Sequence, residues 1–476
     1  MTSMTAQVVQ FGLNLAGTMV LARLLTPHDY GLVGMVTVVV HFAQMFKDAG
    51  LSMATVQRES ISHQQISTLF WLNVLISTSI GLCVLASSPV VAWFYGKSEL
   101  TAITAALSLS FFITGLTIQH QALLRRHMQF GSLAVIQIAS YLGNLAVTIP
   151  LAFLGWRYWA LVAGSIATAL CTTTLTLVFC PWSPGWMKRG TGVRGMLKFG
   201  AHLTGFTFFD YFAGNADNIL IGRFIGADAL GLYAKAYNMM KLPATQIRVP
   251  LSQVAMPVLS ALRNQPERYV KYYQRLIDII ASLAIPLSLY CAIEADFLVR
   301  TLLGRQWLGA VPVFRLLALA ALIHVVAGTR GLVLISHGYS KRFFYFGMGS
   351  ALGTVASFAI GLPFGITGVA AGYAIAKYVI LIPSLYYCFQ GTPITVSLFL
   401  RTIAPPMLAG LTAVGSVALM KYAGAGDSTI SHLAYAALFA AIYAGLSWCR
   451  LSVRETLRLM LNGLPVISGK TVRVAP

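Results

Sequence analysis

Two pairs of charged residues are spaced by seven positions within stretches of this sequence that are otherwise apolar. Asp210 and Asp217 form the first pair, and Lys241 and Arg248 form the second. Because seven residues correspond to about two turns of an α-helix, each pair lies on one helix face. Lysine and arginine on one face suit phosphate or carboxylate groups, whereas carboxylates suit a proton or a cation. The spacing therefore predicts one cationic and one acidic helix face.

The same pattern of polar positions occurs 200 residues earlier in the chain. At this offset Gln10 aligns with Asp210, Asn14 with Gly214, Gly17 with Asp217, His41 with Lys241, and Asp48 with Arg248. Two loop sequences align as well, LARLLTPHDYGLVG over 21–34 and IGRFIGADALGLYA over 221–234, and they match Arg23 with Arg223. An even number of predicted spans separates the copies, so both halves have one orientation, as in the parallel repeats of many transporters.

The elements that carry these residues are long apolar runs. The chain has 476 residues, of which 57% are hydrophobic and only 10% are charged, and its mean hydropathy is +0.75. A soluble domain carries about 25% charged residues. Lipid forces each backbone polar group to bond within its own segment, so such runs predict spanning helices. We expect an all-α polytopic membrane protein with about fourteen transmembrane helices. The expected spans lie near 4–22, 31–48, 68–94, 101–119, 131–153, 158–179, 197–218, 230–257, 273–302, 309–335, 343–363, 366–388, 400–421 and 430–449.

The repeat predicts two pseudo-twofold-related six-helix bundles around a central cavity, followed by two additional helices. The expected parts are an N-terminal bundle over 1–180, a cytoplasmic linker over 181–196, a C-terminal bundle over 197–390, additional helices over 391–449, and a cytoplasmic amphipathic tail over 450–476. Connections on the side of the two termini carry more than twice as many Lys and Arg residues as those on the other side. Both termini are therefore expected in the cytoplasm.

Charged side chains at membrane depth cost several kcal/mol and normally face a bundle interior or a water-filled path. The residues expected to line the cavity and bind a substrate are Lys241, Arg248, Arg330, Lys377, His41, Asn14 and Gln10. Basic groups outnumber acidic ones among them, which favours an anionic substrate. For Gln10 and Asn14 the alternative is that they hydrogen-bond between helices and stabilise packing.

Other charged positions have several possible roles. Asp217, Asp210 and Asp48 are the candidates for coupling to protons or sodium, and the first two are alternatively counter-charges for Lys241. Arg23 is a candidate for a topological anchor, a charge partner for lipid phosphate or a gate residue, and Arg223 is a candidate for an anchor or a gate. Glu294 and Asp296 follow an apolar run, and a local ion pair with Arg300 is expected.

Several function classes lack support in the sequence. The segment GLPVISGKT over 463–471 has the wrong glycine spacing for a phosphate-binding loop, and none of the six cysteines has the spacing of metal ligands. The net charge of +20 comes from basic residues spread through short loops, so no nucleic-acid partner is expected. We expect no metal and no cofactor. Any active transport would use an ion gradient such as that of protons or sodium, the membrane potential or the gradient of the substrate itself.

Two motif blocks resemble one family of membrane transporters. FKDAGLSMATVQRESISHQQISTLFWLNV over 46–74 and NADNILIGRFIGADALGLYAKAYNMMKLP over 215–243 are similar to the polysaccharide transporters. The branch that they resemble contains the colanic acid, teichuronic acid and succinoglycan exporters, within the multidrug/oligosaccharidyl-lipid/polysaccharide exporter superfamily. The resemblance implies two bundles around a cavity that opens alternately to either side of a bacterial inner membrane.

The resemblance also implies a cargo and a pathway. The cargo is an oligosaccharide repeat unit on undecaprenyl pyrophosphate, flipped for exopolysaccharide or lipopolysaccharide biosynthesis. Lys241 and Arg248 would hold the pyrophosphate, assisted by Arg330 or Lys377. A polysaccharide polymerase and chain-length or export proteins are the implied partners, beside the lipid-linked oligosaccharide and the bilayer.

Two alternatives remain at this point. The first keeps the fold and makes the chain a cation-coupled antiporter of drugs or metabolites, which would need unpaired carboxylates. The second is a membrane polysaccharide polymerase or ligase, which would need a sizeable external loop that the sequence lacks. We therefore expect a transporter and not an enzyme.

Overall fold

The computed structural model describes most of the chain, and the regular secondary structure of the described part is helical. The described residues are 2–47, 52, 55–56, 61–187, 211–212, 214–423 and 428–448. No strand occurs among them. The expected all-α class is therefore confirmed for the residues that the structure describes.

The first seven named helices follow the apolar runs of the N-terminal part. They are α1 (Thr2–Leu24), α2 (Pro27–Phe46), α4 (His63–Tyr95), α5 (Glu99–Gly115), α6 (Ile118–Arg126), α7 (Phe130–Phe153) and α8 (Tyr158–Phe179). A further helix runs over 214–224. Two of these helices have a capping box at the N-terminus, formed by Thr26 and Asp29 at α2 and by Ser62 and Gln65 at α4. Each box satisfies backbone N–H groups that the first helical turn leaves without a partner.

The remaining helices complete the chain from residue 227 onward. They are α10 (Ala227–Ala261), α11 (Pro266–Ile293), α12 (Ala295–Leu302), η1 (Arg305–Ala310), α13 (Val311–Ala327), α14 (Arg330–Ser336), α15 (Ser340–Gly361), η2 (Leu362–Phe364), α16 (Gly365–Phe389), α17 (Val396–Tyr422) and α18 (Thr429–Trp448). Three expected single spans are divided between two helices: one at Leu116 and Thr117, one at Glu294, and one at Gly328 and Thr329.

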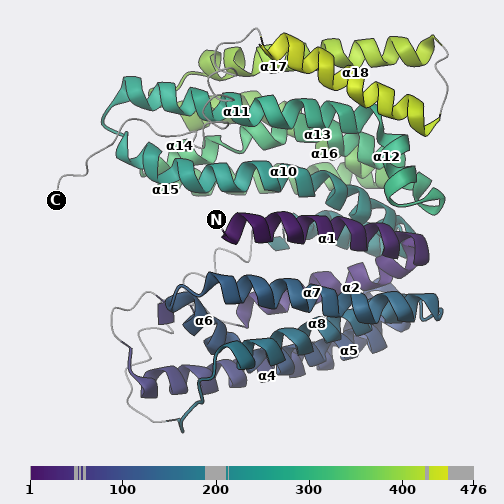
Figure 1. Cartoon of the computed structure of the whole chain (residues 1–476), viewed down its shortest axis with the longest axis vertical. Helices are drawn as coiled ribbons and strands as arrows, with labels where there is room; N and C mark the ends of the chain where they lie inside the picture. Colours follow the sequence, from purple (N-terminus) through teal and green to yellow (C-terminus); the bar gives the residue numbers. More distant parts are fainter. Residues whose placement is uncertain are drawn as a thin grey trace. The chain divides into compact units, whose positions relative to one another are not determined.

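The chain divides into two compact units. The first comprises Met1–Ala234 and Val299–Gly309, and the second comprises Lys235–Leu298 and Ala310–Pro476. In the first unit α7 packs on α8, α4 on α5, and α1 on α7 (Figure 1). In the second unit α15 packs on α16, and α11 packs on both α13 and α17 (Figure 1). Helix α10 begins in the first unit and continues into the second.

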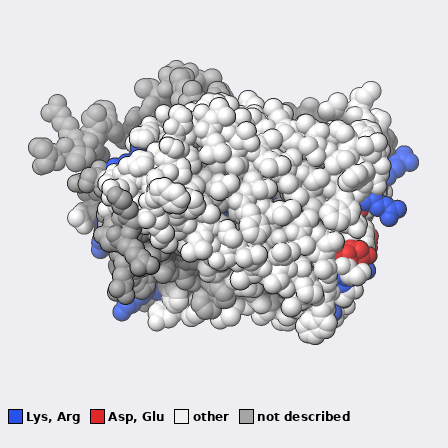
Figure 2. Space-filling model, turned by 90° about the horizontal axis from the view of Figure 1, so that it is seen from below, with Lys and Arg blue, Asp and Glu red and all other residues white. Residues whose placement is uncertain are grey.

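The described helices suit a lipid environment. Nine of them are long and apolar enough to cross a membrane, or ten if the bent pair Glu99–Gly115 and Ile118–Arg126 is one span. On the face drawn in Figure 2, Lys and Arg side chains lie toward the two ends and the area between them is uncharged. The chain is therefore a multi-pass membrane protein.

Three parts of the expected architecture stay predictions. These are the number of fourteen spans, the arrangement of two six-helix bundles around a cavity, and the domain boundaries. The predicted tail over 450–476 and residues 188–196 of the predicted linker lie outside the described residues. Helices α1 and α10 are not among the nine described spans, and both carry the polar residues of the repeat.

Candidate functional site

The two copies of the repeated loop meet through a pair of glycines. A Cβ atom placed on Gly31 would overlap the backbone carbonyl of Ala227, and one placed on Gly231 would overlap the carbonyl of Pro27. The two contacts are related by the 200-residue offset, as a twofold axis between the copies would relate them. Only glycine allows this approach, so the first turns of α2 and α10 cross in backbone contact.

We call this contact of α2 and α10 at Gly31 and Gly231 the glycine crossing. Polar contacts surround it, and all of them lie within the first unit. His28 Nδ1 lies 2.9 Å from Asp228 Oδ2, and these residues are also separated by the 200-residue offset. The Arg23 guanidinium donates to the backbone carbonyl of Thr301 at 3.0 Å. The Trp307 indole donates to the backbone carbonyl of Ala22 at 2.7 Å. The loop between α1 and α2 is therefore fastened both to α10 and to the segment around η1.

Four of the predicted substrate-binding residues lie around one histidine in the second unit. His324, on α13, interacts electrostatically with all four cationic side chains. These are Lys241 and Arg248 on α10, Arg330 on α14 and Lys377 on α16. We call these four residues and His324 the cationic cluster. The structure thus brings together side chains that are up to 136 positions apart in the sequence.

Two members of the cationic cluster are held by hydroxyl groups. The Lys377 ammonium donates to Thr354 Oγ1 at 3.1 Å and lies 4.7 Å from the centre of the Tyr373 ring. The Arg330 guanidinium donates to Ser384 Oγ and lies 5.0 Å from the centre of the Phe346 ring. These contacts fix the positions of the two charges without neutralising them, because hydroxyl groups and rings carry no net charge.

The other two cations lie on α10. The Lys241 ammonium lies 5.8 Å from the centre of the Tyr237 ring, and its side chain is exposed. The half-buried Arg248 side chain passes Gly328, where a Cβ atom would overlap its guanidinium. The break between α13 and α14 therefore leaves the space that Arg248 occupies.

The cationic cluster has no nearby counter-charge in the described part of the chain. Ion pairs elsewhere in that part include those of His28 with Asp228 and of Glu294 with Lys421 and His432. No described carboxylate lies within ion-pair distance of the four cations. Four positive charges without carboxylate partners favour the binding of an anion with more than one negative charge.

The predicted residues of the first repeat lie in the other unit. Gln10 and Asn14 are half-buried on α1, and His41 is exposed on α2. The buried Asp217 accepts hydrogen bonds from the Tyr233 hydroxyl at 3.0 Å and from the Asn218 backbone N–H at 2.8 Å. Asp210 and Asp48 lie outside the described residues.

The two predicted gate or anchor arginines have different surroundings. Arg23 binds the Thr301 carbonyl beside the glycine crossing. Arg223 is exposed, and its guanidinium lies 5.7 Å from the centre of the Phe94 ring and 5.8 Å from that of Phe224. The 200-residue offset therefore relates their positions in sequence but not their contacts.

Two features were missed by reading the sequence. His324 stands alone in an apolar run, and only the three-dimensional structure places it among four cations. Glu294 was expected to form a local ion pair with Arg300, whereas its carboxylate pairs with Lys421 at 2.6 Å and with His432 at 2.7 Å. Glu294 lies at the end of α11, where α17 and α18 supply partners from distant sequence.

The helices and their apolar surface define a polytopic membrane protein, and the cationic cluster gathers four basic side chains in its second unit. A family model described as polysaccharide biosynthesis protein matches residues 20–312, and the chain belongs to this family. It is 28% identical over 319 residues to teichuronic acid biosynthesis protein TuaB of Bacillus subtilis, covering 65% of each chain. It is 25% identical over 483 residues to succinoglycan biosynthesis transport protein ExoT of Rhizobium meliloti, covering 100% of this chain and 96% of that one.

Solved structures show the same fold. The lipid II flippase MurJ in an inward closed conformation matches with a TM-score of 0.75 at 14% identity, covering 93% of this chain and 97% of that one. A multidrug resistance MATE family transporter in an inward-facing conformation matches with a TM-score of 0.62 at 15% identity, covering 85% and 94%. The chain therefore shares its fold with these two solved structures.

Proposed function

We propose that this protein is a flippase that moves oligosaccharide units linked to undecaprenyl pyrophosphate across the bacterial inner membrane. The observation that carries the proposal is the cationic cluster, whose four positive charges have no carboxylate partner in the described part of the chain. A pyrophosphate would otherwise cross hydrocarbon at a prohibitive cost. Relatives named for polysaccharide biosynthesis and transport support the choice of a lipid-linked sugar as cargo.

The members of the cationic cluster have different roles in binding. Lys241 and Arg248, on one face of α10, bind the two phosphate groups. Arg330 and Lys377, held by Ser384 and Thr354, add charge at fixed positions. The protein binds and reorients the cargo and catalyses no covalent step, so it acts as a transporter and not as an enzyme.

The glycine crossing supplies a gate for this proposal. With both termini in the cytoplasm, the first turns of α2 and α10 lie at the outer side of the membrane. Their contact closes that side, and alternating access requires it to separate. Polysaccharide polymerase and export proteins would act on the cargo after its release.

A cationic drug is a poorer fit to the same fold. Such a cargo needs a carboxylate that is free to bind it, and the cationic cluster offers four groups of the wrong sign. The described buried carboxylates of Asp217 and Glu294 already have hydrogen-bond or ion-pair partners.

The test is the double variant Lys241→Ala and Arg248→Ala in a strain that lacks the native gene. We expect surface polysaccharide to fall at least about tenfold, because losing two charge-assisted contacts costs more than about 1.4 kcal/mol. The lipid-linked oligosaccharide should then accumulate in the inner leaflet.

The matched control is Arg268→Ala with Lys271→Ala, which removes two exposed charges near the start of α11. Export should be unchanged in this control. Normal export by the Lys241/Arg248 variant at normal protein level would refute the proposed binding role.

A further inference from the structure

A pocket that the proposed cation site does not use lies in the first unit. It has a volume of about 310 Å³ and lies between α2, α4 and the helix over 214–224. Six of its eleven lining residues are aromatic, and the others are valine or isoleucine. The six are Phe42, Trp93, Phe94, Tyr95, Tyr211 and Phe212. A lining of this kind binds hydrocarbon.

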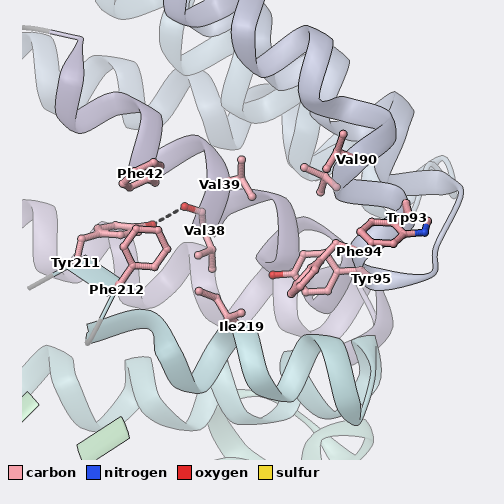
Figure 3. A pocket seen from close by; sticks show the side chains of 11 residues that line it. Val38, Val39, Phe42, Val90, Trp93, Phe94, Tyr95, Tyr211, Phe212 and Ile219 are labelled. Atoms are coloured by element: carbon pink, nitrogen blue, oxygen red, sulfur yellow. Dashed lines mark hydrogen bonds between the residues drawn. The ribbon is translucent and has the colours of Figure 1, made fainter. Parts of the chain in front are cut away.

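The aromatic residues gather at the two ends of the pocket (Figure 3). At one end the Phe42 ring lies 4.9 Å from that of Phe212 and 5.8 Å from that of Tyr211. The Tyr211 hydroxyl donates to the backbone carbonyl of Val38, so this polar atom already has a partner (Figure 3). Trp93, Phe94 and Tyr95 form the other end.

The pocket is open at the surface of the first unit. The Trp93 side chain is 80% exposed and the Val90 side chain is 59% exposed, although both line the pocket. A hydrocarbon chain can therefore enter the pocket between them.

A cation lies beside the end of the pocket that Trp93, Phe94 and Tyr95 form. The exposed Arg223 guanidinium lies 5.7 Å from the centre of the Phe94 ring, and Phe94 lines the pocket. No described carboxylate lies within ion-pair distance of Arg223. A hydrocarbon slot with a cation at its rim is complementary to a lipid with an anionic head.

We propose that this pocket binds the polyprenyl chain of the lipid carrier, with the carrier phosphate at Arg223. The inference rests on the proposed function and adds a second binding station for the same cargo. Branched, unsaturated isoprene units pack well on aromatic faces, which make up both ends of the pocket. Because Arg223 is expected at the outer side, this station receives the carrier after the pyrophosphate has left the cationic cluster.

The experiment uses a polyprenyl phosphate that carries a photoreactive diazirine in its tail. The full-length protein is reconstituted in phosphatidylethanolamine nanodiscs and irradiated, and labelled peptides are mapped by mass spectrometry. We expect labelling of residues 90–95. The variant Val39→Trp fills the pocket and should lower that labelling at least about tenfold. Val178→Trp makes the same change at a 69% exposed position of α8 and should leave labelling unchanged.

Competition identifies the lipid. Unlabelled polyprenyl phosphate should suppress labelling, whereas phosphatidylglycerol at the same concentration should not. Equal suppression by phosphatidylglycerol would overturn the proposal, because the pocket would then be a general lipid site. Arg223→Gln should weaken competition by polyprenyl phosphate but not by the uncharged polyprenol, and Arg157→Gln serves as its control.

Flipping is measured in proteoliposomes of the same protein. Flipping without labelling at 90–95 would overturn this inference and leave the proposed function intact. Labelling without flipping would keep the lipid site and refute the transport function. If Val39→Trp does not fold, labelling of the native protein and the two competition series still decide the outcome.

Discussion

At the scale of single residues, the structure contrasts charges that are paired with charges that are left unpaired. Glu294 is fully buried and holds both Lys421 and His432, and the His432 ring stacks on Phe297 with ring centres 4.1 Å apart. The four cations of the cationic cluster have no such partner among the described residues. Paired buried charges fasten helices together, whereas unpaired ones remain available to a ligand.

The first prediction concerns the Glu294 ion pairs. Glu294→Ala should lower the stability of the protein by about 3 kcal/mol, because it leaves a lysine and a histidine facing a buried cavity. Glu294→Gln keeps the shape and should cost less. Glu267→Ala, at an exposed site in the first turn of α11, is the control. Thermal unfolding in detergent measures the effect, and equal midpoints for Glu294→Ala and the control would contradict it.

The second prediction concerns Gly328. A side chain at this position would displace the Arg248 guanidinium. Gly328→Ala should therefore reduce export while leaving the protein folded, because it moves one charge of the cationic cluster. Gly347→Ala, where a Cβ atom would meet nothing within 4 Å, should have no effect. Export and thermal stability are measured together. A loss of export alone would indicate displacement of Arg248, whereas a loss of both would indicate a structural role for Gly328.

At the scale of helices, the glycine crossing shows how two elements are brought into backbone contact. Gly31→Ala and Gly231→Ala each place a methyl group on a carbonyl of the other helix. Each variant should hold the first turns of α2 and α10 apart and reduce export. Gly12→Ala, on α1 with open space around its Cβ position, is the control. Normal export by both crossing variants would show that this contact has no part in transport.

The sequence predicts the helices better than it predicts their interruptions. Apolar runs gave most helices to within a few residues, because hydropathy reports what lipid requires. The divisions at Glu294 and Gly328 were missed, since each depends on partners from distant sequence: Lys421 and His432 at Glu294, and Arg248 at Gly328. Helical spacing placed Lys241 and Arg248 on one face. The gathering of Arg330 and Lys377 near them depends on the packing of α13 and α14 on α16 and on the contact of Arg248 with Gly328. The aromatic pocket has no periodic signal at all, because three separate segments form it.

At the scale of the whole molecule, the proposed mechanism places two opposite requirements on the contact between the repeated loops. The crossing of α2 and α10 must close tightly to keep ions from leaking, and it must also open to release the cargo. His28 and Asp228 lie at this crossing, with Nδ1 and Oδ2 2.9 Å apart and both side chains accessible. They form a polar contact that water can replace, as the proposed outer gate requires.

The last prediction follows from this arrangement. In a double variant His28→Cys and Asp228→Cys, a short thiol cross-linker should join the two helices and stop flipping in proteoliposomes. A reducible cross-linker should restore flipping when it is cleaved. The single variants control for modification of one thiol and for the native cysteines. If cross-linking is complete and flipping continues at the native rate, the α2–α10 crossing does not open during transport, and the outer gate must lie elsewhere in the chain.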